Sequence, residues 1–144
     1  MSVEENLRLV DALFEVHNAH DWGREAEMLA EDVVYHFYGP AEPVVVRGPE
    51  DHRQGHERHV KAFPDFRLNK VRAFGQGEWV CVEYVESGTF TGPMRTAEGK
   101  TISPTNRSYR LSGCVVYRIH EGKVAEAHVY GDSSTLRAQL GLAP

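Results

Sequence analysis

The sequence predicts an α+β fold, in which one curved mixed or antiparallel β-sheet wraps around N-terminal helices as a cone. Two observations predict it. Apolar residues in the first 63 positions recur mainly at helical spacing, whereas the later segments are rich in β-branched and aromatic residues and are separated by turn signals. Three helices followed by a run of strands is an α+β pattern, and the cone that results has an apolar mouth suited to a small molecule.

The length and composition limit the possible partners. A chain of 144 residues, 41% of them hydrophobic, fits one domain spanning residues 1–144. The net charge of −5 argues against binding nucleic acid or an anionic membrane, because both require clustered Lys and Arg. No signal peptide begins at Met1, and no apolar run approaches the roughly 18 residues of a membrane span. We therefore expect a cytoplasmic protein.

Three helices are expected in the first half of the chain. The first starts after Ser2 and ends near Asn18–Asp21, with an apolar stripe at Leu7, Val10, Leu13, Phe14 and Val16. A short second helix covers Gly23–Leu29. The third follows Gly48, has Pro49 at its first position and acids in its first turn, and runs to about Phe63.

The strands come next, each bounded by turn residues. The patterns predict Val33–Tyr38 ending at Gly39–Pro40, then Phe66–Ala73, Trp79–Phe90 and Tyr109–His120, with a turn at Gly75–Gly77 and a long polar loop at Gly92–Arg107. Cys81 and Cys114 fall within these strands, where we expect small buried thiols rather than a disulfide.

The chain ends with a hairpin and a helix. Glu121–Gly122 supplies the positive φ that a tight connection to Lys123–Tyr130 requires. Asp132–Ser133–Ser134 offers capping oxygens to a final helix, Thr135–Leu140, which Gly141 closes.

Four segments in order resemble the SnoaL-like polyketide cyclases of the nuclear-transport-factor-2-like superfamily. They are Phe63–Pro64–Asp65, Gly88–Thr89–Phe90–Thr91–Gly92, Pro104–Thr105–Asn106–Arg107, and the ending Arg118–Ile119, Gly122–Lys123–Val124, Glu126, Asp132 and Leu136–Gln139–Leu140–Gly141. The resemblance covers almost the whole chain and implies the cone-shaped fold. It also implies a two-fold homodimer formed through the outer sheet face and acid–base chemistry without a cofactor.

The closing strand holds the first candidate site. In the family it resembles, an acidic residue there is the general acid/base of an intramolecular aldol closure. At the matching positions Val129 replaces the first Asp, and Asp132 remains. Asp132 is either that acid/base or a helix N-cap. If Val129 lines the cone, strand alternation sends His128 and Tyr130 to the other face, so His128 is either a substrate contact or part of the dimer face.

The strand Trp79–Phe90 holds the second candidate. Alternation puts Tyr84 and Glu86 on one face and Glu83 on the other. The limonene-epoxide-hydrolase branch of the superfamily carries an Arg and an Asp at the positions of Tyr84 and Glu86, so the resemblance does not support that hydrolase. Glu86 stays a candidate acid/base and Tyr84 a candidate substrate contact.

Ketosteroid isomerase, a relative by fold, has its base and its two oxyanion-hole donors at positions that match Phe37, Leu13 and Val115. All three residues are apolar here. That isomerase site is therefore absent.

Histidines form the third candidate. His52, His56 and His59 share one stripe of the third helix. Two His at this spacing can chelate a metal, but HRQGH lacks the Glu of H-E-x-x-H and the sequence places no acid nearby, so we expect no metal. The stripe is either a solvated or partly buried face, or His56 and His59 line the pocket. His36, with Tyr38 on the same strand face, is a pocket residue or part of the core.

These patterns favour a cofactor-independent enzyme that removes a proton α to a carbonyl of a small apolar compound and closes a ring. Asp132 or Glu86 would serve as acid/base, and oxyanion donors would come from His36, Tyr38, Tyr84 or a histidine of the third helix. The alternatives are a non-catalytic binding protein and, less favoured, a hydrolase or dehydratase of a secondary metabolite. The sequence contains no G-x-G-x-x-G, Walker loop or G-x-S-x-G elbow.

Overall fold

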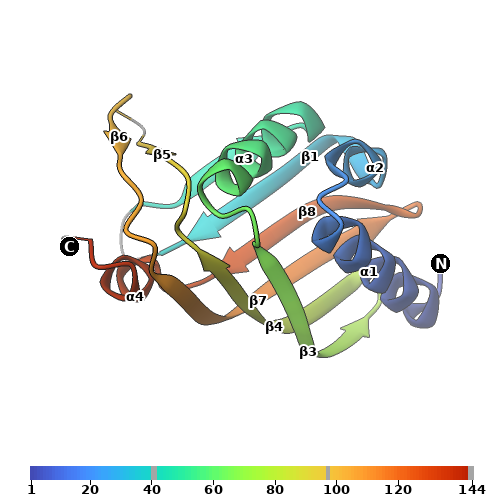
Figure 1. Cartoon of the computed structure of the whole chain (residues 1–144). Coiled ribbons are helices and arrows are strands. Elements are labelled where there is room, and N and C mark those ends of the chain that lie inside the picture. Colours follow the sequence, from blue (N-terminus) through green and yellow to red (C-terminus); the bar gives the residue numbers. More distant parts are fainter. Residues whose placement is uncertain (40–41, 97, 143–144) are drawn as a thin grey trace.

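The computed structural model describes residues 1–39, 42–96 and 98–142. The helices are α1 Val3–Asn18, α2 Trp22–Glu27, α3 Pro49–Ala62 and α4 Ser133–Gln139. The strands are β1 Leu29–Tyr38, β2 Val44–Arg47, β3 Arg67–Gln76, β4 Trp79–Thr89, β5 Met94–Arg95, β6 Thr101–Ile102, β7 Ser108–His120 and β8 Lys123–Tyr130 (Figure 1). Helices precede most of the sheet, as an α+β fold requires.

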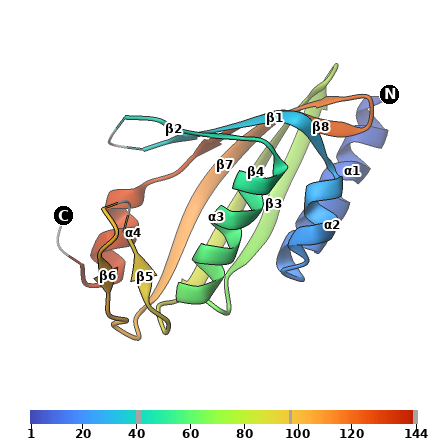
Figure 2. The same ribbon diagram turned by 90° about the horizontal axis from the view of Figure 1, so that it is seen from above.

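One six-stranded sheet has the order β2-β1-β8-β7-β4-β3. The pair β1 and β8 is parallel, and the other neighbours are antiparallel, so the sheet is mixed, as predicted. Seen from above, α1, α2 and α3 lie along one face of the sheet, while α4, β5 and β6 gather at one end (Figure 2). We call the helix-covered face the inner face and the opposite one the outer face.

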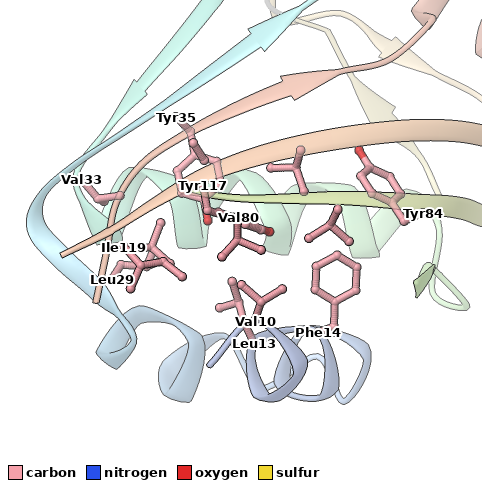
Figure 3. Packing of buried hydrophobic residues seen from close by; sticks show 14 residues of the cluster. Val10, Leu13, Phe14, Leu29, Val33, Tyr35, Val80, Tyr84, Tyr117 and Ile119 are labelled. Atoms are coloured by element: carbon pink, nitrogen blue, oxygen red, sulfur yellow. The ribbon is translucent and has the colours of Figure 1, made fainter. Parts of the chain in front are cut away.

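Helix α1 fixes one side of the core. The Ser2 side chain accepts a hydrogen bond from Glu5 N and caps the helix, as predicted. Its apolar stripe, Val10, Leu13 and Phe14, is buried against inner-face residues that include Val80, Tyr84, Tyr117 and Ile119 (Figure 3). Burying each aliphatic or aromatic side chain stabilises the fold by about 1.5–3 kcal/mol.

Several boundaries differ from the sequence-based prediction. Strand β1 begins at Leu29 rather than Val33, because its first residue pairs with β8 across an irregularity in register. Strand β3 continues through Gly75 and Gln76, and Gly77 alone takes the positive φ, 57°, of the turn. Strand β2 and the small β5–β6 pair were not predicted. Pro40, expected to stop β1, lies outside the described residues.

The C-terminal hairpin and helix agree with the prediction. Glu121 and Gly122 have φ values of 50° and 77°, the paired positive values of a tight hairpin turn. Asp132 caps α4 by accepting hydrogen bonds from the backbone N–H groups of Ser134 and Thr135. Within the described part of the chain, no helix is both long enough and apolar enough to cross a bilayer.

Candidate functional site

A cavity lies between the inner face of the sheet and helices α1, α2 and α3. It measures about 570 Å³ including its open mouth, and it is lined mainly by apolar and aromatic side chains, with Glu25, Glu86 and three histidines among them. A second hollow at the mouth shares Phe37, His52, His56, Glu86 and Val129 with it and adds His59. Such a space suits a small, largely apolar molecule with a few polar groups.

Strand alternation places the predicted residues of β4 as expected. Tyr84 and Glu86 line the cavity, whereas the Glu83 side chain is half exposed and pairs with Arg72. Leu13, Phe37 and Val115, the residues at the ketosteroid-isomerase positions, also line the cavity, as does Val129. Apolar side chains therefore occupy the places where relatives of this fold carry their acids and hydroxyls.

Glu86 is the terminus of a short hydrogen-bonded chain. Tyr109, on β7, donates its hydroxyl proton to Glu86 Oε2 over 2.6 Å. The same hydroxyl oxygen lies 3.2 Å from His59 Nε2, which must donate because the tyrosine has only one proton to give. Gly88 makes room for this arrangement, since a Cβ there would lie 2.9 Å from the Tyr109 ring. In the described part of the chain, Glu86 Oε1 has no hydrogen-bond partner.

Burial sets the protonation states of this chain. It raises the pKa of Glu86, an effect that the hydrogen bond from Tyr109 only partly opposes. It also lowers the pKa of His59 to about 3, with the charge of His56 adding to the effect. Glu86 is thus a carboxyl group with raised basicity beside a neutral imidazole, which is the combination that proton transfer near neutral pH requires.

A second buried acid, Glu25 of α2, is surrounded by histidines. His17 Nδ1, at the end of α1, donates to Glu25 Oε2 over 3.0 Å. Glu25 Oε1 lies 3.3 Å from His52 Nδ1 and 3.2 Å from His56 Nε2, both on α3. The two α3 histidines meet each other, Nε2 to Nε2, at 3.1 Å. We call Glu25, His17, His52 and His56 the inner cluster.

The inner cluster is almost dry, with Glu25 only 3% exposed, His52 5% and His17 7%. Burial alone would raise the pKa of Glu25, but hydrogen bonds from His17 and His56 outweigh it and hold that pKa well below its usual range. Burial lowers the pKa of His17, and it lowers that of His52 to about 3. The carboxylate is therefore ionised, while His17 and His52 are neutral.

Sequence reasoning missed Glu25 and His17. The expectation that no acid lies near HRQGH is wrong, because Glu25 stands 27 positions before His52 in the chain yet lies within 3.3 Å of it. The packing of α2 against α3 brings them together, and a spacing rule within one helix cannot detect this. The available signal was an acid and a histidine at the buried ends of two short neighbouring helices.

His36, Tyr38 and His128 do not line the cavity, which corrects the prediction that they contact substrate. His36 stacks on His128 with ring centres 4.6 Å apart, on the opposite face of β1 and β8 from Phe37 and Val129. His128 Nε2 donates to Glu126, and the Tyr38 hydroxyl donates to His128 Nδ1. Alternation gives the reason: once Val129 faces inward, its neighbour must face outward.

Asp132 lies outside the cavity lining as well. Its carboxylate is occupied by the backbone and hydroxyl groups of Ser134 and Thr135, which lower its pKa to about 2. A carboxylate held in this way is a poor base at the end of a helix, so the N-cap alternative describes Asp132 in this structure.

Comparisons with known proteins agree with this architecture. Similar solved structures include IdmH of Streptomyces antibioticus, a candidate polyketide cyclase (24% identity, TM-score 0.76, covering 95% of this chain and 99% of that one). TsrD of Streptomyces laurentii has 20% identity and a TM-score of 0.79, covering 99% of both chains. A phenazine biosynthesis-related protein of Pseudomonas aeruginosa has 16% identity and a TM-score of 0.74, covering 98% and 88%. No curated protein matches the chain at a significant level.

A family profile described as SnoaL-like polyketide cyclase matches residues 7–140. That range includes every helix and strand from α1 to α4 and every residue that lines the cavity. The chain therefore belongs to the SnoaL-like polyketide cyclase family.

Proposed function

We propose that this protein is an acid–base enzyme of the cyclase or isomerase type, acting on a small, largely apolar carbonyl compound in the inner cavity. The observation that carries the proposal is Glu86, a carboxyl group with a raised pKa that faces an apolar space and has one unpartnered oxygen. Membership in a cyclase family supports the reaction class.

Glu86 Oε1 would take a proton from the carbon α to a carbonyl, leaving an enolate. The enolate carbon would form a bond to a second carbonyl carbon of the same molecule, and the resulting alkoxide would regain the proton from Glu86. His59 and Tyr109 would hold Oε2 throughout, so the carboxyl group stays aimed at the substrate while its charge changes. This proton transfer needs no cofactor if the developing oxyanion has a donor in the cavity.

Donors for that oxyanion are available nearby. The Tyr84 hydroxyl lines the same cavity, and burial raises its pKa, with the charge of Glu86 adding to the effect, so it remains a neutral O–H donor. His56 of the inner cluster also lines the cavity and lies close enough for its charge to affect Glu86. Asp132 and His36, which the sequence suggested for chemistry, have no part in the proposed mechanism.

The test is proton NMR in D₂O with a panel of 1,3-dicarbonyl and aryl-ketone compounds shown to bind. We expect the protein to accelerate exchange at the α carbon, and Glu86→Gln to reduce the rate by about 100-fold or more. Glu83→Gln, on the same strand but the outer face, is the matched control and should leave the rate unchanged, as should Asp132→Asn.

Equal loss in Glu83→Gln and Glu86→Gln would remove Glu86 as the base. Tight binding without any exchange would instead favour the alternative that the cavity holds a ligand without chemistry. The apolar residues at Leu13, Phe37, Val115 and Val129 would then serve only as its walls.

A further inference from the structure

The inner cluster contains more nitrogen than the hydrogen bonding of one carboxylate requires. Three imidazoles approach the two oxygens of Glu25, and the ring nitrogens of His52 and His56 also face each other. His17 Nε2 is buried and has no hydrogen-bond partner within residues 1–39, 42–96 and 98–142. Buried polar atoms are normally paired, so this arrangement calls for an explanation beyond mutual hydrogen bonding.

We infer that the inner cluster is a binding site for a divalent first-row transition cation, held by His17, Glu25 and His56. This goes beyond the proposed function, which needs no metal. One ligand atom from each of the three residues can be chosen so that all lie within 4.8 Å of one another. Two histidines and one carboxylate are a donor set found in zinc hydrolases and in non-haem iron sites.

The distances fit such an ion. Ligands bound at 2.0–2.1 Å in a tetrahedron lie roughly 3.3 Å apart. The distances from Glu25 are 3.0 Å to His17 Nδ1 and 3.2 Å to His56 Nε2, so binding requires shifts of only a few tenths of an ångström. Imidazole donors favour zinc, iron, cobalt or nickel over magnesium and calcium, which prefer oxygen.

The surroundings hold the ligands in place and leave one side accessible. Trp22 stacks on the His56 ring at 4.7 Å and 13°, and Tyr35 lies 4.1 Å from the His52 ring, so neither imidazole can rotate freely. His52 approaches both Glu25 and His56 and is placed as an outer partner that orients them. All three ligand residues line the cavity, so a substrate oxygen could complete the coordination.

The test uses Co²⁺ alone, without any substrate. Protein freed of metal with a chelator is titrated with CoCl₂ while visible absorption is recorded, since four- or five-coordinate Co²⁺ bound by imidazole gives intense bands. We expect one Co²⁺ per chain, bleaching of the bands by one equivalent of Zn²⁺, and a rise in the unfolding temperature when Zn²⁺ is added.

The variants identify the ligands. Glu25→Gln and His56→Gln should each weaken Co²⁺ binding by at least about 100-fold, whereas His52→Gln should weaken it by roughly 10- to 100-fold as an outer partner does. His128→Asn, which alters the stacked histidine pair of the outer face, is the control and should leave binding unchanged. Circular dichroism establishes that each variant is folded.

The proposal is overturned if the wild-type protein gives no bands, or if His128→Asn removes them while folded Glu25→Gln and His56→Gln retain them. The wild-type spectra and the Zn²⁺-dependent unfolding temperature do not rely on any variant folding. Because none of these readouts is an activity, failure of the metal site is distinguishable from failure of the proposed proton transfer at Glu86.

Discussion

The two faces of the sheet carry similar residue types in opposite settings. On the inner face, tyrosines, valines and Glu86 are covered by helices and surround a cavity. On the outer face, His36, Tyr38, His128 and Tyr130 form a stacked aromatic ladder, with Trp79 beside His128. Trp79 is 41% exposed and Tyr130 47%. The same alternation of side chains thus produces a site on one face and a surface on the other.

The comparison shows that covering by helices, not residue type, assigns the chemistry. His128 on the outer face makes two hydrogen bonds near solvent, whereas His52 on the inner side has its pKa lowered to about 3 by burial. A histidine stripe therefore says little about function until the elements that cover it are known.

The largest expected difference between the faces is in stability. Ile119 is buried on the inner face, and its neighbour Arg118 points outward to Glu78 and Glu126. Ile119→Ala should lower the free energy of unfolding by about 2–5 kcal/mol through lost burial and a cavity. Arg118→Ala should cost no more than about 1 kcal/mol, because exposed ion pairs contribute little. Urea unfolding measures both, and equal costs would contradict the assignment of faces.

The next prediction concerns the outer face as an interface. We expect the exposed aromatic ladder and Trp79 to pair with a second copy of the chain, as the resemblance implies. Trp79→Asp should weaken the dimer by at least about 10-fold, since it removes an anchoring aromatic and buries a charge. Sedimentation velocity over a range of concentrations gives the dissociation constant. A wild-type chain that stays monomeric at micromolar concentration would sink this prediction.

The smallest expected effect is in the pH dependence of stability. The unfolded chain protonates His59 near pH 6.5, but burial lowers its pKa in the folded chain to about 3. Between these values only the unfolded state binds the proton, so stability falls as the pH is lowered. Between pH 7.5 and 5.5 the wild-type protein should lose about 1 kcal/mol more than His59→Gln. Parallel curves for the two proteins would show that His59 is solvated.

Much of the framework follows from the sequence because local chemistry determines it. Ser2 and Asp132 offer capping oxygens, and Glu121–Gly122 adopts the positive φ of its turn whatever the distant surroundings. Alternation likewise determined that Tyr84 and Glu86 share a face and that Val129 and His128 do not. Periods of two and 3.6 residues relate neighbours in the chain, so a sequence displays them directly.

Only the tertiary structure decided which of those faces meet. Glu25, His17, His52 and His56 come from three helices whose packing is set by side-chain fit and by the parallel pairing of β1 with β8, neither of which has a local signal. The Glu86, Tyr109 and His59 chain likewise joins β4, β7 and α3. Long-range contacts of this kind depend on the whole fold, and the candidate chemistry of this protein depends on them.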